Sequence, residues 1–242
     1  MQNYKIYIGR NAGSELLEDM HNAKESVKII SPYLSPEYIR DLIGIQEKGV
    51  NVSLITSDNI ETNNRVDFSH RDIIIQHCHT DELAFQERKV LLNYTMISAA
   101  LTLITFILGL FTSLFLFFLT LVFFISSSIL YLMYANKVVY TYTYSPLFDF
   151  KVFFSQYSSE EFKNDFLIHS KLYIIDDKIA YMGSVNYTYS GLVNSFECLT
   201  RLNDLKDIEY LNQEYKKLFY NKRLHFKDIE QWGRELYDEP IN

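Results

Sequence analysis

The chain has 242 residues, which is enough for one sizeable domain or two small ones. Its net charge of −7 argues against a surface that attracts nucleic acid or anionic lipid everywhere, although a local cationic cleft is compatible with it. Two cysteines, Cys78 and Cys198, are too few for a disulfide scaffold and suit a reducing cytosol. The first ten residues contain no continuous apolar stretch, so we expect no signal peptide.

The N-terminal part alternates strands with helices. Apolar strands are predicted at Tyr4–Ile8, Val27–Ile30 and Val50–Ile55. Between them, apolar residues at helical spacing predict one helix that begins at Ser14 and a second helix over Tyr38–Glu47. Strands that alternate with helices favour a mostly parallel sheet that is covered on both faces.

A polar stretch follows over Asn59–Glu87, and it contains His77, Cys78 and His79. A metal site here would need a further ligand from elsewhere, and strand alternation would point Cys78 away from both histidines. We therefore interpret these residues as surface side chains at the end of a strand. We expect neither a bound metal nor another cofactor.

The segment Val90–Asn136 contains no Asp, Glu, Lys, Arg or His. As helix it is long enough to cross the hydrocarbon core of a bilayer, about 30 Å thick, twice. We predict a transmembrane hairpin with helices near Leu91–Leu108 and Ser113–Met133 and a turn at Gly109–Thr112. A helix pair buried in a soluble core is the alternative, but such helices rarely stay uncharged on every face.

The charges that flank this segment predict its orientation. Arg88 and Lys89 precede the first helix, Lys137 follows the second, and the turn is uncharged. Under the positive-inside rule both flanks are cytoplasmic. We expect a multi-pass protein of a bacterial-type inner (cytoplasmic) membrane, anchored by residues 90–136, with its catalytic part in the cytoplasm.

The C-terminal part is predicted to be rich in strands and to end in an amphipathic helix that covers the core. Two strands flank the turn at residues 176–178 and form a hairpin. The predicted strands are Val138–Tyr144, Phe150–Phe154, Phe166–Ile175, Ile179–Met182 and Phe196–Leu202, and the helix is Asp204–Asn221, which would bury Leu205, Ile208, Leu211, Tyr215 and Leu218.

One run in this part has the spacing His-x-Lys-x4-Asp-x6-Gly-Ser, which begins at His169 and ends at Ser184. Residues two apart in a strand share a face, so His169 and Lys171 would point at one site. An imidazole can attack phosphorus and form a phosphohistidine, while an ammonium stabilises the charge on the phosphate oxygens. A lone His-x-Lys would be read as a core histidine and an edge lysine, but the full set favours catalysis.

This run resembles the His-Lys-Asp motif of the phospholipase D superfamily, including Gly183 and the later Asn186, and Glu197 stands where relatives often carry an acid. The resemblance covers roughly residues 4–57, with the loop Ser31–Ser35, and 150–218. It implies an α/β fold, with a mixed sheet flanked by helices and interrupted by the hairpin. The expected parts are residues 1–88, the hairpin 89–137, and residues 138–242 with the motif.

The resemblance also implies the roles of six catalytic residues. They are His169 as nucleophile, Lys171 and Asn186 as ligands of the non-bridging phosphate oxygens, Ser184 as a further hydrogen-bond donor, Glu197 as acceptor from the second imidazole nitrogen, and Asp176, which we interpret as holding its turn. Superfamily enzymes use two motifs, and this chain has one. A symmetric homodimer would supply the second histidine as general acid.

The substrate is predicted less directly. The sequence Asn186–Glu197 resembles the short single-motif nucleases of the superfamily more than its cardiolipin synthases, which favours a membrane-anchored, nuclease-like phosphodiesterase. The hairpin favours a phospholipid substrate, because an anchored site meets head groups at high effective concentration. Two alternatives therefore stay open: a phospholipase D or cardiolipin-type enzyme, whether hydrolase or transphosphatidylase, and a non-catalytic membrane scaffold.

Overall fold

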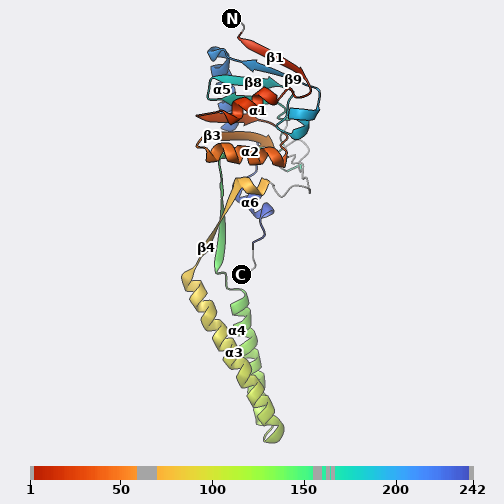
Figure 1. The fold of residues 1–242 in the computed structure, drawn as a ribbon. Helices are drawn as coiled ribbons and strands as arrows, with labels where there is room; N and C mark the ends of the chain where they lie inside the picture. Colours follow the sequence, from red (N-terminus) through yellow and green to blue (C-terminus); the bar gives the residue numbers. More distant parts are fainter. Residues whose placement is uncertain (1–2, 59–69, 155–159, 162–163, 165–166, 240–242) are drawn as a thin grey trace. The chain divides into compact units, whose positions relative to one another are not determined.

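A computed structural model of the protein describes residues 3–58, 70–154, 160–161, 164 and 167–239 (Figure 1). Its internal contacts divide the chain into two compact units. The first, which we call the α/β unit, comprises Met1–Ile75 and Tyr144–Tyr237. The second, the hairpin unit, comprises Gln76–Thr143 and Asp238–Asn242.

A seven-stranded sheet forms the centre of the α/β unit. Only β2, β3 and β6 are parallel to one another, and every other neighbouring pair is antiparallel. In spatial order the strands are β1 (Tyr4–Gly9), β9 (Glu197–Leu202), β8 (Ile179–Gly183), β7 (Leu172–Ile175), β2 (Ser26–Ile30), β3 (Asn51–Ser57) and β6 (Asp149–Phe153).

The mixed sheet confirms the predicted fold class, but the expectation of a mostly parallel sheet is wrong. Strands β7 and β8 are joined by a tight turn, which can connect only antiparallel neighbours, and β9 also pairs antiparallel with β8. Strand β1 pairs with β9 at the edge instead of with β2. Helices cover both faces, as expected.

Helices α1 (Ser14–His21) and α2 (Pro36–Glu47) lie on one face of the sheet, and α5 (Leu205–Phe219) lies on the other (Figure 1). On the α1 side, the Tyr181 hydroxyl donates to Asp19 over 2.5 Å. On the α5 side, Ile208 and Tyr215 join the apolar core. Leu205 stays 67% exposed, contrary to expectation, because it occupies the first position of its helix.

Helix α6 (Ile229–Leu236) was not predicted from the sequence. It carries the only tryptophan, Trp232, which is buried with its ring 5.7 Å from that of Phe150. Gly233 permits this packing, because a Cβ atom there would lie 2.2 Å from the Tyr144 ring. Helix α6 therefore contributes to the core of the α/β unit.

The hairpin unit contains two long apolar helices, α3 (Glu82–Phe111) and α4 (Phe115–Ala135) (Figure 1). Both are long and apolar enough to cross a membrane. Helix α3 begins earlier than predicted because the Asp81 side chain caps it, accepting from the Ala84 amide over 3.0 Å. The turn between the helices lies at residues 112–114, slightly later than the predicted turn.

Polar side chains join the two helices. Ser98 donates to the carbonyl of Phe123 over 3.0 Å, and the hydroxyls of Thr120 and Thr105 are also 3.0 Å apart. Small hydroxyl residues between helices are typical of membrane helix pairs, where each polar group needs a partner within the protein. Next to the helices, β4 (Ile74–Thr80), which follows the 3₁₀ turn η1 (His70–Ile73), pairs with β5 (Tyr140–Pro146).

Candidate functional site

Five of the six predicted site residues lie at one edge of the sheet. His169 and Lys171 precede β7, Ser184 and Asn186 follow β8, and Glu197 begins β9. The strand β8 is antiparallel to both neighbours, so its end shares an edge with the beginnings of β7 and β9. We call this side of the sheet, where β8 ends and β7 and β9 begin, the histidine edge.

The predicted strand Phe166–Ile175 is shorter than expected. Strand β7 begins only at Leu172, and Phe166 lies outside the described residues. His169 and Lys171 are therefore in an irregular segment next to the sheet and not within it. Strand alternation was thus the wrong reason for bringing these two side chains together, although they do lie side by side.

The Lys171 ammonium contacts the His169 ring. Its Nζ atom lies 3.0 Å from Nδ1 and 3.2 Å from Nε2, and it donates to the His169 carbonyl over 2.7 Å. Lys171 is only 6% exposed, whereas His169 is exposed. Burial lowers the pKa of Lys171, and the charge of Glu197 opposes this shift. An accessible imidazole beside a buried cation forms a site that suits an anionic phosphodiester.

Ser184 and Glu197 form a second pair at the histidine edge. The Ser184 hydroxyl donates to the Glu197 carboxylate and accepts from the Cys198 amide over 3.0 Å. Gly183 makes this approach possible, because a Cβ atom there would lie 2.1 Å from the Cys198 carbonyl oxygen. Among the described residues, Glu197 makes no hydrogen bond to His169, so its expected role in orienting the imidazole stays a prediction.

Two buried side chains fix the backbone on either side of Asn186. The Tyr173 hydroxyl donates to the carbonyl of Val185 over 2.7 Å, and the Ser31 hydroxyl accepts from the amide of Tyr187 over 2.9 Å. Burial raises the pKa of Tyr173, which keeps its phenol protonated as a donor. The Oδ1 atom of Asn186 is buried and has no hydrogen-bond partner within the described part of the chain.

The sequence analysis did not assign roles to Ser31 and Tyr173. Ser31 comes from the N-terminal half, directly after β2, and its hydroxyl also donates to the carbonyl of Tyr33 over 2.7 Å. Its position before Pro32, at the end of an apolar strand, was the available signal. Tyr173 lies two residues after Lys171 but carried no signal, because an aromatic residue in a strand is ordinary core.

Asp176 lies at the opposite edge of the sheet, in the turn that follows β7. Its carboxylate accepts from the amides of Lys24, Glu25 and Ser26 over 2.7–3.1 Å. Burial alone would raise its pKa, but these amide hydrogen bonds outweigh it and the pKa is lowered. Its backbone is left-handed, with φ of 53°. The sixth residue therefore joins the turn to the beginning of β2.

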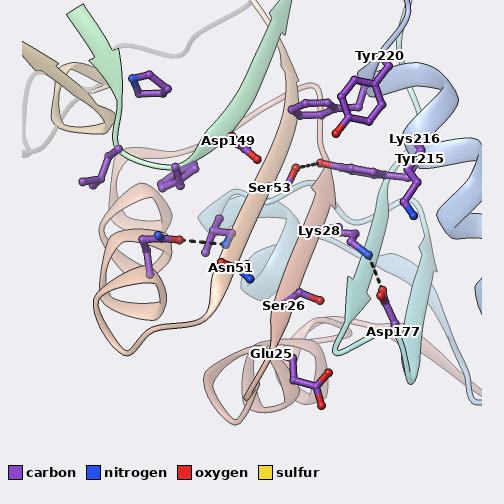
Figure 2. A pocket seen from close by; sticks show the side chains of 16 residues that line it. Glu25, Ser26, Lys28, Asn51, Ser53, Asp149, Asp177, Tyr215, Lys216 and Tyr220 are labelled. Carbon is purple, nitrogen blue, oxygen red and sulfur yellow. Dashed lines mark hydrogen bonds and ion pairs between the residues drawn. The ribbon is translucent and has the colours of Figure 1, made fainter.

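Two cavities of similar size accompany the sheet. One, of about 750 Å³, lies at the edge that carries Asp177, away from the histidine edge. Figure 2 shows two of its polar pairs, Lys28 turned to Asp177 and Ser53 turned to Tyr215. Lys28 is thus paired with a carboxylate and the cavity contains no residue of the histidine motif, so we do not assign the chemistry to it.

The other cavity, of about 700 Å³, borders the motif. Most of its lining is apolar, and the lining residues include Ile30, Ser170, Lys171, Leu172, Met182, Gly183, Leu211 and Leu218. It is therefore the cavity in which an apolar part of a substrate would lie closest to the histidine motif.

No group of three or more His, Cys, Asp or Glu side chains that could hold a metal occurs in the described residues. His79, from the sequence His77-Cys78-His79, instead has its Nε2 atom 2.8 Å from the Thr143 hydroxyl. Both cysteines are exposed and free.

Residues 134–219 match the family model described as "Cardiolipin synthase, PLD-like domain". Similar solved structures include NucT from Helicobacter pylori, with 16% identity over 93% of this chain and 98% of that chain and a TM-score of 0.49. They also include Nuc from Salmonella typhimurium, a phospholipase D family member, with 13% identity over 93% and 98% and a TM-score of 0.45. Phosphatidylserine synthase from Haemophilus influenzae has 9% identity over 98% of this chain and 43% of that chain, with a TM-score of 0.44. None of the curated proteins matches the chain.

Proposed function

We propose that the chain is a member of the phospholipase D superfamily, with residues 134–219 matching a PLD-like family model, and that it is a phosphodiesterase that acts through a phosphohistidine on His169. The observation that carries the proposal is the contact between the exposed His169 ring and the buried Lys171 ammonium, 3.0 Å from Nδ1. It combines a nucleophile with a cation for the non-bridging oxygens.

In the proposed reaction a ring nitrogen of His169 forms a bond to phosphorus, and the bond from phosphorus to the leaving oxygen breaks. A second histidine gives its proton to that oxygen. The same histidine then takes a proton from water, which attacks phosphorus and releases His169 with a phosphomonoester. Lys171 and Asn186 would stabilise the equatorial oxygens, and Ser184 would hold the Glu197 carboxylate beside them.

We propose that the second histidine comes from a second copy of the chain. The sequence holds one complete motif. His225 and Lys227 repeat its first spacing, but Lys227 pairs with Glu235 over 2.8 Å. Large apolar side chains near the histidine edge are uncovered, with Met182 46% and Phe196 79% exposed. Contact with a second copy would cover such side chains.

For the substrate we propose a nucleic acid phosphodiester first, because the sequence after the motif resembles that of single-motif nucleases. A phospholipid is the second candidate. The observation that favours it is the largely apolar cavity beside Lys171 and Leu172, which would accept the apolar part of a lipid. Helices α3 and α4 support a membrane anchor, with the α/β unit in the cytoplasm.

One assay separates these possibilities. Detergent-purified wild type and His169→Ala would be incubated with DNA, RNA and phospholipid in the presence of EDTA. We expect turnover of one class in wild type, a loss on the order of 10⁴-fold in His169→Ala, and a phosphohistidine on the wild-type peptide that contains His169. Activity that needs an added divalent metal would contradict the mechanism. Folded protein with no turnover of any substrate would favour the scaffold.

A further inference from the structure

A small cavity of about 300 Å³ lies within the hairpin unit, outside the site described above. Residues from the first turns of α3 and the end of α4 form its walls, together with the first residue of β5. They are Phe85, Arg88, Lys89, Leu92, Tyr134 and Tyr140. Two cations, three aromatic rings and one leucine thus surround one space.

The two cations are held by aromatic rings instead of acids. The Arg88 guanidinium carbon lies 4.9 Å from the centre of the Tyr134 ring, and the Lys89 ammonium lies 4.3 Å from that of Phe85. The nearby Lys137, by contrast, pairs with the Glu87 carboxylate. Neither Arg88 nor Lys89 has a carboxylate partner in the ranges that the structure describes, and Arg88 Nε is buried there without a hydrogen-bond acceptor.

Arg88 is half-buried with its Nε atom lacking an acceptor, and the exposed Lys89 adds a second positive charge beside it, so an anion is the ligand that suits this cavity. The position of the cavity along α3 indicates which kind of anion it would bind. Arg88 and Lys89 stand directly before the uncharged segment that begins at Val90, and Tyr94 and Tyr131 belong to the same ends of the two helices. Aromatic and basic residues at this level are typical of the membrane interface, where lipid phosphates lie.

We propose that this cavity binds the phosphate of an anionic phospholipid, with Arg88 and Lys89 as its ligands and the aromatic rings around the glycerol. The site serves to hold the hairpin unit at the anionic leaflet and is separate from the histidine edge. The proposal rests on the proposed membrane insertion of α3 and α4, but not on any catalytic activity.

The test measures lipid binding by native mass spectrometry on the full chain in detergent, with His169→Ala throughout so that turnover does not interfere. The probes are phosphatidylglycerol and phosphatidylcholine with the same acyl chains. We expect at least tenfold tighter binding of phosphatidylglycerol, and a loss of about 10- to 30-fold in Arg88→Gln/Lys89→Gln. The control Lys48→Gln/Lys222→Gln removes two exposed charges from the α/β unit and is expected to bind like its parent.

The outcomes are decisive in each direction. Equal binding of the two lipids, or equal losses in the control and the double variant, would overturn the site. Competition by millimolar inorganic phosphate would assign the cavity to free phosphate and overturn the lipid. If circular dichroism shows that the double variant is unfolded, Arg88→Lys takes its place. It keeps the charge but loses the planar fork, so a severalfold loss is expected and unchanged binding would contradict the proposal.

Discussion

Ser31 and Tyr173 hold the two peptide groups that flank Asn186, although neither would touch a substrate phosphate. We therefore regard them as positioning residues. Their effect should lie on kcat, because a small displacement of a phosphate ligand weakens transition-state stabilisation more than substrate binding.

We predict that Ser31→Ala lowers kcat by about 10- to 100-fold and leaves KM within a few-fold. The measurement is hydrolysis of bis-p-nitrophenyl phosphate. The matched control is Ser53→Ala, which removes another serine hydroxyl whose partner, Tyr215 at 2.6 Å, lies on the α5 side of the sheet. A similar loss in both variants, or a change in KM alone, would rule out the positioning role.

For Asp176 we predict an effect on stability and not on kcat, because its contacts connect a turn to β2 and not to the histidine edge. We expect Asp176→Asn to lower the free energy of unfolding at pH 7 by about 1–3 kcal/mol, since the carboxylate accepts several amide hydrogen bonds. Asparagine tolerates the left-handed backbone, so no strain is added. The kcat of the folded variant should not change.

The pH dependence follows from the lowered pKa of Asp176. A carboxyl group with a lower pKa in the folded state stabilises the fold above its unfolded value, near 3.8, and loses this contribution as the pH falls through the folded pKa. Denaturant unfolding of wild type and Asp176→Asn should therefore differ at pH 7 and converge below 3.8. A constant difference over the whole pH range would contradict this account.

At the scale of elements, the hairpin unit is inserted into the α/β unit between Ile75 and Tyr144. The Leu147 amide donates to the Ile73 carbonyl over 2.9 Å, so the two ends of the insertion lie side by side. Replacing residues 76–143 by a short Gly/Ser linker should leave a folded, soluble domain, because closing a short loop costs little entropy. Circular dichroism and gel filtration without detergent measure this. Aggregation under all conditions would show that the sheet depends on the helices.

The orientation of α3 and α4 can be tested in a chain whose two cysteines are replaced by serine. Ser113, in the turn between the helices, would carry the reporter cysteine, because it is exposed and its backbone needs no glycine. We expect Ser113→Cys to react with a membrane-impermeant reagent added to intact cells, and Lys48→Cys to react only after lysis. The reverse pattern would invert the topology.

Helices and strands with a clear hydrophobic periodicity, or with turn residues at their ends, could be predicted from the sequence. Each predicted strand other than Phe166–Ile175 is found within two residues of its expected bounds, and the two apolar helices are confirmed as helices. Pairing could not be predicted, because the partner of β1 depends on contacts made almost 200 residues later in the sequence. The motif predicted which residues would gather, but not that Ser184 would bond to Glu197 or that Ser31 would reach Tyr187. Those contacts depend on tertiary packing.

At the scale of the whole molecule, we predict that activity needs two copies of the chain. Wild-type and His169→Ala chains with different affinity tags would be coexpressed, and the heterodimer purified through both tags. It should retain less than about one hundredth of the wild-type activity, because one of the two histidines needed for acid–base and nucleophilic chemistry is missing. The Ser53→Ala chain, paired in the same way, serves as control. Full activity in an isolated monomer would refute the requirement for a second copy.

The pairing of β1 with β9 also sets an order for biosynthesis. Tyr4 lies opposite Leu202, so the first strand leaves the ribosome long before its partner has been translated. The apolar helices emerge in between and can enter the bilayer before β1 has a partner strand to pair with. If α3 and α4 form the proposed anchor, the nascent chain would therefore be anchored before its sheet can close. The histidine edge would then be assembled only after the chain has reached the membrane.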